Sequence, residues 1–261
     1  MTNVDIGEPP PQTLPMRPDE YRGGPIDLAV LDGTDWAALD RGPGDRSLPE
    51  LVRALVTARD DEGEWEYLMW SELMGAVVDQ GDCFPATVAL VPILAGLATS
   101  SGLTASRRLD LHMALVVIAG RALAEAVDVS PAQVDQWAAK VHATVGEVVP
   151  RLLQRWRYQP VAIQFPLAVL AGLYPEQGST SASEVDRLAQ ELAGTQPGAY
   201  LDLAYALLQR DEIAAVTTAR RILSWDEQID PSLLDPPGLP AALVCGHLLQ
   251  QGAMGIASNH E

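Results

Sequence analysis

From Ser47 onward, hydrophobic residues recur along this chain at the three- and four-residue spacing that is typical of α-helices. A first helix is expected after Ser47-Leu-Pro-Glu50, because this is a capping box in which serine and glutamate satisfy first-turn amides. A second is expected over Trp65–Asp79, and the same pattern predicts further helices over residues 85–99, 104–126, 131–157, 161–173, 182–193, 199–210, 212–225 and 240–256. No alternating run bounded by turns suits a strand, so we predict an all-α protein.

Residues 1–46 differ from the rest of the chain because they are rich in proline, glycine and aspartate. Proline fixes φ and lacks a backbone donor, so this stretch cannot propagate a helix. We therefore expect two parts. Residues 1–46 form an irregular or disordered acidic arm with at most one turn around Asp35–Leu39, and residues 47–261 form a helical-repeat domain.

Three short segments suggest an internal repeat: Phe84–Val88, Phe165–Val169 and Leu239–Leu243. Each contains an apolar residue followed by proline, and we expect each to open a helix, where the missing donor of proline has no cost. Phe84 and Phe165 are 81 residues apart, and 74 residues separate the second and third prolines. Both separations are near twice the roughly 40-residue period of two-helix HEAT-type repeats.

A family resemblance rests on Trp70, on the segment Asp79-Gln-Gly-Asp-Cys-Phe-Pro-Ala-Thr87, and on Val91-Pro-Ile-Leu94. This order resembles a pattern in bacterial HEAT-like helical-repeat proteins of uncharacterised function: a tryptophan, a His-Gln-Gly-Thr-like turn, an aromatic residue, Ala-Thr, and a Val-Pro-hydrophobic-Leu helix. It covers about 25–30 residues, and Asp79 stands where the family has histidine. The resemblance implies HEAT-like antiparallel helix pairs forming a short α-solenoid, and it implies no chemistry.

Composition adds a strong acidic charge to this architecture. The 261 residues include 35 Asp and Glu against 17 Lys and Arg, a formal net charge of −18, and 48% hydrophobic residues suffice for a core. Residues 1–82 hold 18 acidic and 6 basic residues, a net of −12, whereas residues 83–261 hold 17 and 11, a net of −6. Direct binding of nucleic acid or an anionic membrane is not expected, because both need a cationic surface.

The cysteine content and the hydrophobic runs bear on localisation. Two cysteines are too few for a disulfide-stabilised secreted domain, and the first residues lack a signal-peptide pattern. The longest apolar runs are too short or interrupted to span a bilayer. We expect a cytoplasmic protein with no membrane contact.

The densest acidic run adjoins an aromatic cluster, and together they are the best candidate for partner binding. Acidic side chains suit a basic partner, and tryptophan and tyrosine are favoured at interfaces. A solvated loop between helices is the alternative, and the EF-hand order of calcium ligands is absent. The candidate residues are Asp60, Asp61, Glu62, Glu64, Trp65, Glu66, Tyr67 and Trp70.

Arg151, Arg155 and Arg157 surround Trp156 and form a candidate anion-binding site. Guanidinium forks and neighbouring aromatic rings suit a carboxylate or phosphate, although ion pairs with nearby acids are an alternative. No histidine or cysteine spacing matches a metal site or a catalytic motif, so we name no catalytic residue, metal or cofactor. His112 is expected to be a buried, hydrogen-bonded histidine, and Cys83 a small apolar residue packed between helices.

These observations favour a non-enzymatic helical-repeat scaffold that binds another protein with a basic surface, as an acidic regulator or an immunity-type protein does. An enzyme, or an accessory subunit of a biosynthetic pathway, that binds a small apolar molecule between helices is the alternative, and His112, His142 and Cys245 are the groups to find in such a pocket. A structural or oligomerisation module is a third class, and the oligomeric state stays open.

Overall fold

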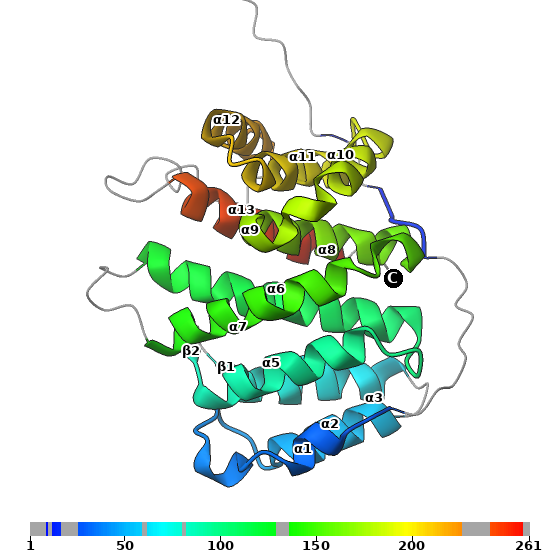
Figure 1. The fold of residues 1–261 in the computed structure, drawn as a ribbon, viewed down its shortest axis with the longest axis vertical. Coiled ribbons are helices and arrows are strands. Elements are labelled where there is room, and N and C mark those ends of the chain that lie inside the picture. Colours follow the sequence, from blue (N-terminus) through cyan, green and yellow to red (C-terminus); the bar gives the residue numbers. More distant parts are fainter. Residues whose placement is uncertain are drawn as a thin grey trace, which may run out of the picture.

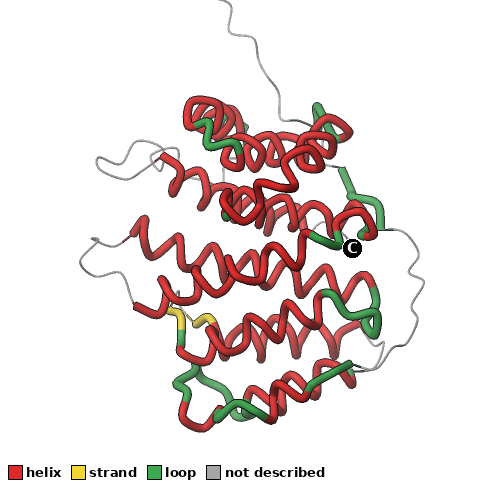
Figure 2. The backbone as a smooth tube through the Cα atoms, in the orientation of Figure 1, coloured by secondary structure: helices red, strands yellow, loops and turns green. Residues whose placement is uncertain are grey.

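The computed structural model of this chain describes residue 9 and residues 12–16, 26–58, 62–79, 82–128, 136–225 and 241–257. These residues are predominantly helical (Figure 2). They also include one short antiparallel pair of strands, β1 (Val78–Asp79) and β2 (Asp82–Cys83), in which Val78 lies opposite Cys83. The predicted all-α class is confirmed.

The N-terminal part begins with short helical turns and a first amphipathic helix. The Ser47 backbone amide donates to Glu50 Oε2 at 2.8 Å, as the capping box predicted, and Leu51, Val52 and Leu55 of this helix face the core. Trp36–Ala38 is the turn that was expected near Asp35–Leu39, and the turn at Ala29–Asp32 was not predicted. The elements are α1 (Ala29–Asp32), η1 (Trp36–Ala38), α2 (Leu48–Thr57), α3 (Glu62–Glu66), η2 (Tyr67–Leu73) and α4 (Met74–Val77).

The segment η2 is a π-helix between two α-helical turns, whereas an uninterrupted α-helix was expected. Its wider turn is visible where the backbone amide of Met74 donates to the carbonyl of Met69, five residues earlier. Leu68, Met69 and Leu73 are buried, so the segment keeps one apolar face despite the change of helical type.

The longer helices follow from residue 85 onward, and most begin and end near the predicted positions because capping, proline and glycine signals act locally. Residues 161–173 form a helix with the predicted bounds. The elements are α5 (Pro85–Ala98), α6 (Ala105–Asp128), α7 (Gln136–Leu153), η3 (Trp156–Tyr158), α8 (Val161–Leu173), α9 (Pro175–Gly178), η4 (Ser179–Ser181), α10 (Ala182–Glu191), α11 (Gln196–Leu208), α12 (Glu212–Leu223) and α13 (Ala241–Ala257).

One of the predicted repeat signals was wrong. Pro85 is the first residue of α5, but Pro166 lies inside α8, five residues after the helix begins at Val161. The two Phe-Pro segments therefore occupy different positions in their helices. Proline has no cost at the start of α5, whereas inside α8 it removes one backbone hydrogen bond of the helix. Leu239 and Pro240, which belong to the third segment, lie outside the described residues.

The helices are stacked along the long axis of the molecule, from α1 and α2 at one end to α10, α11 and α12 at the other (Figure 1). The helix α8 is buried on nearly every side and contributes the centre of the core. The helix α13 departs from sequence order, because it returns to pack on α6, α8, α11 and α12. Leu14 and Leu31, from the predicted arm, are also buried in the core.

Candidate functional site

Some residues of the predicted acidic and aromatic cluster are exposed, whereas Trp65 is buried. Its side chain is only 4% exposed, and its Nε1–H donates to Asp110 Oδ2 of α6 at 2.7 Å. The guanidinium of Arg107 lies 4.7 Å from the Trp65 ring, a cation–π distance. Burial raises the pKa of Asp110 to about 6, the hydrogen bond from Trp65 opposes this shift, and the charge of Glu66 adds to it. Trp65 thus links α3 to α6.

Glu64, Glu66 and Tyr67 form the accessible part of this cluster. The two glutamates are exposed and Tyr67 is 58% exposed, whereas Trp70 is half-buried and packs against the core. Glu62 is the first residue of α3, and Asp60 and Asp61 lie outside the described residues. The structure therefore brings one exposed aromatic side chain and two exposed carboxylates together at this position.

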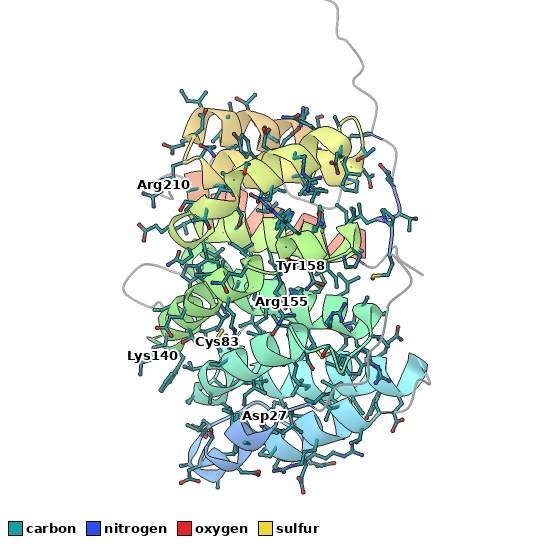
Figure 3. The ribbon with its side chains drawn as sticks, turned by 45° about the vertical axis from the view of Figure 1, so that its right-hand side comes forward. Asp27, Cys83, Lys140, Arg155, Tyr158 and Arg210 are labelled. Atoms are coloured by element: carbon teal, nitrogen blue, oxygen red, sulfur yellow. The ribbon has the colours of Figure 1, made fainter. Side chains whose placement is uncertain are left out.

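Further exposed carboxylates surround α1, η1 and α2 at the same end of the molecule, where Figure 3 labels Asp27. Within the described ranges, Arg53 pairs with Asp32 and Arg46 pairs with Glu72 at 3.6 Å. Hydrogen bonds from Ser47 lower the pKa of Glu50. We call the following set the N-terminal acidic surface: Asp27, Asp32, Asp35, Asp40, Asp45, Glu50, Glu64 and Glu66.

The predicted arginine cluster is only partly retained. Arg157 donates to Glu184 at 3.2 Å, so its guanidinium already has a carboxylate partner. Arg151 and Arg155 instead line an open pocket of about 560 Å³ with Thr99, Gln154 and Tyr158. We call this the arginine pocket. Figure 3 shows Arg155 and Tyr158 close together on one side of the molecule.

A second hollow, which we call the central cleft, has a volume of about 480 Å³. It is lined by residues of α6, α7, α8, α9, α11, α12 and α13. Its wall is mostly apolar, and Arg210, Asp211 and Glu212 lie at its polar edge. Sequence reasoning missed these three residues, although the polar run that they form between two helices was a usable signal. The apolar lining includes Leu123, Leu173, Leu207, Ala215 and Leu243.

His142 is the one previously considered histidine that lines the central cleft. Its ring stacks on Tyr174 with centroids 4.5 Å apart, and its Nδ1 shares a hydrogen bond with the Tyr174 hydroxyl at 3.0 Å. Burial lowers the pKa of His142 and raises that of Tyr174. The pair is therefore uncharged near neutral pH.

The other histidine and cysteine candidates are buried. His112 is 1% exposed and its Nδ1–H donates to the Arg108 carbonyl at 2.6 Å, which confirms the expected core histidine. Cys83 is buried too, as predicted. Cys245 is also buried, and burial together with the charge of Glu212 raises the pKa of its thiol to about 11. Its thiol is therefore protonated near neutral pH.

Compared with known proteins, this chain matches no family model, no curated protein and no solved structure. Across the parts of the chain that the structure describes, no three histidine, cysteine or acidic side chains are grouped so that they could hold a metal ion. No described helix combines the length and apolarity that crossing a bilayer requires. Function must therefore be inferred from the geometry and charge of the surfaces described above.

Proposed function

We propose that this protein is a non-enzymatic HEAT-like helical scaffold whose N-terminal acidic surface binds a protein with a basic surface. The observation that carries this proposal is the concentration of exposed carboxylates at one end of the molecule, beside the exposed ring of Tyr67. An acidic regulator or immunity-type protein, which masks a cationic face of its target, is the form of this function that we favour.

Three carboxylates of the N-terminal acidic surface are not neutralised by an ion pair within the described ranges. Asp35, Asp40 and Asp45 are exposed and form no ion pair with any residue that the structure describes. Carboxylates crowded on one surface repel each other, and a cationic partner replaces that repulsion by attraction. Tyr67 adds apolar contact area with a polar hydroxyl, a combination that is favoured at interfaces.

The order of the helices supports a HEAT-like solenoid for residues 47–223. Along this part of the chain, neighbouring helices pack on one another: α5 on α6, α6 on α7, and α11 on both α10 and α12. Such stacks offer extended surfaces for macromolecular partners. The helix α13 packs on α6, α8, α11 and α12 and so does not continue the stack in sequence order. We therefore propose a short solenoid whose C-terminal helix returns to pack against earlier helices.

Affinity purification with two matched charge variants tests the proposed partner surface. The N-terminal charge variant carries Asp35→Asn, Asp40→Asn, Asp45→Asn and Glu66→Gln. The distal charge variant removes the same number of exposed carboxylates elsewhere: Glu147→Gln, Glu191→Gln, Asp202→Asn and Glu212→Gln.

A basic protein should co-purify with the wild-type chain and with the distal charge variant at low salt. It should not co-purify with the N-terminal charge variant. At high salt it should be lost from the wild-type chain and from both variants, because screening weakens attraction between exposed charges. Capture that is indifferent both to salt and to the N-terminal substitutions would contradict the proposal.

The central cleft favours a second candidate function, the binding of a small apolar molecule between helices. Its volume of about 480 Å³ lies within the usual range for ligand pockets, and His142 supplies a polar group. Of the three groups named for such a site, His142 lines the cleft, whereas His112 and Cys245 do not. Native mass spectrometry of the purified protein tests this candidate: a bound small molecule that Leu173→Trp excludes supports it, and an unliganded protein counts against it.

A further inference from the structure

The arginine pocket holds two cations that no carboxylate of the described residues neutralises, although the chain has twice as many acidic as basic residues. The side chain of Arg155 is exposed and forms no hydrogen bond or ion pair with any described residue. The side chain of Arg151 donates to the carbonyl of Pro92 at 3.4 Å, and no carboxylate among the described residues pairs with it. By contrast, carboxylates within the described ranges pair with Arg46, Arg53, Arg157, Arg187, Arg210 and Arg221.

The lining of this pocket is suited to an anion. The described residues that line it include two arginines and no acidic side chain, in a protein whose net charge is −18. Arg151 lies in the last turn of α7, and Arg155 lies just beyond the end of that helix at Leu153, before η3 begins. Both side chains line the same pocket. Each guanidinium presents several N–H groups in a fixed plane, which matches the oxygens of a phosphate group. An anion between them also relieves the repulsion of two like charges.

Tyr158 adds a different kind of contact on the same wall. It is 87% exposed, the most exposed of the large hydrophobic side chains that the structure describes. The turn η3 that carries Tyr158 is anchored by Trp156, which is only 2% exposed, so the base of the turn is fixed while the tyrosine ring stays accessible. An exposed aromatic face beside cationic groups is the arrangement on which nucleic-acid bases stack.

We propose that the arginine pocket binds a mononucleotide, with Arg151 and Arg155 holding its phosphate group and Tyr158 stacking on its base. The pocket volume of about 560 Å³ accommodates a ligand of this size. Stacking is tolerant of the base, because every base offers a flat face. The proposal is independent of the N-terminal acidic surface, because Arg155 and Tyr158 lie midway along the stack, whereas Asp27 lies near one end of it (Figure 3).

Calorimetric titration of the full chain with AMP, ribose 5-phosphate and adenosine separates the two contacts. AMP should bind saturably with a Kd below about 1 mM at low salt. Ribose 5-phosphate should bind about tenfold more weakly, because it lacks the stacking base. Adenosine should give no measurable binding, because it lacks the phosphate group.

Three single substitutions assign the contacts to residues. Arg155→Gln should weaken AMP about tenfold or more, because a charge-assisted hydrogen bond is lost. Tyr158→Ala should bring AMP to the affinity of ribose 5-phosphate and leave ribose 5-phosphate unchanged. Arg187→Gln is the matched control, because Arg187 is an exposed arginine on α10, away from the pocket, and it should leave AMP binding unchanged.

The replaced side chains are exposed, so the variants should keep the wild-type circular dichroism spectrum. Absence of saturable AMP binding up to about 10 mM would overturn the proposal. Equal weakening by Arg155→Gln and Arg187→Gln would overturn it too, because the attraction would then be a general effect of charge. If Arg155→Gln weakens AMP binding and Tyr158→Ala does not, the proposed stacking of the base on Tyr158 is wrong, and the pocket recognises only the phosphate group.

Discussion

At the scale of single residues, Asp110 and His112 of α6 show how burial acts on the two signs of charge. Burial disfavours the charged form of each group, so the pKa of Asp110 rises to about 6 and that of His112 falls to about 4. The two residues therefore make the stability of the folded state depend on pH in opposite directions. Substitution of each separates their effects.

For His112 the folded-state pKa is lowered, so the folded protein binds the imidazole proton more weakly than the unfolded chain does. Its contribution to stability is present above pH 6.5 and is lost as the pH falls toward about 4, by an amount of about 3 kcal/mol. His112→Asn keeps an N–H donor for the Arg108 carbonyl and does not titrate. Denaturant unfolding between these pH values should show wild-type protein losing stability relative to this variant, and parallel curves would contradict the expectation.

For Asp110 the folded-state pKa is raised, so its contribution to stability is fully present below pH 3.8 and is lost as the pH rises through about 6. Asp110→Asn still offers Trp65 an acceptor but carries no charge. Relative to wild-type protein, this variant should gain about 2–3 kcal/mol in free energy of unfolding between pH 4 and pH 8. A constant difference between the two proteins across that range would show that the buried Asp110 carboxyl does not titrate as expected.

At the scale of elements, local signals in the sequence account for most helix bounds. The Ser47 and Glu50 interaction and the bounds of α8 follow from residues that are close in sequence. The π-helical turn at η2 was not predicted, because no local signal in the sequence distinguishes it from an α-helical turn. The burial of Trp65 was missed because its partner Asp110 is 45 residues away.

The packing of α13 on α11 requires a glycine at one close approach. A Cβ atom at Gly252 would come within 1.8 Å of the Tyr200 ring, which is 2% exposed and cannot easily move aside. Gly252→Ala should therefore lower the free energy of unfolding by about 2 kcal/mol or more. Gly96→Ala in α5 is the matched control: nothing lies within 4 Å of its Cβ position, so alanine should stabilise this helix by about 0.5 kcal/mol. Equal effects in chemical denaturation would argue against the tight contact between α13 and α11.

At the scale of the whole molecule, the candidate sites differ in how far the sequence predicts them. The arginine pocket was partly predicted, because Arg151, Arg155 and Tyr158 are close in sequence, at the end of α7 and in the turn that follows it. The central cleft was not predicted, because its walls come from seven helices whose arrangement no local pattern specifies. The N-terminal acidic surface was predicted in part. The sequence shows the excess of acidic residues, but their gathering at one end of the molecule depends on where α1 and α2 pack, which no local pattern specifies.

Repulsion among the carboxylates of the N-terminal acidic surface should lower the stability of the folded protein. The two charge variants test this effect in the absence of a partner. Exposed carboxylates repel one another most strongly at low salt, where the screening length is about 30 Å at 0.01 M, and much less at 0.1 M, where it is about 10 Å. The N-terminal charge variant should therefore have a higher Tm than wild-type protein at low salt, and the gain should shrink as salt is added. In the wild-type protein, Glu191 and Asp202 pair with Arg187 and Arg221, so their replacement in the distal charge variant also removes attraction. Its gain in Tm should be smaller, and an equal gain would mean that repulsion is spread over the whole surface rather than concentrated at the end formed by α1, α2 and α3.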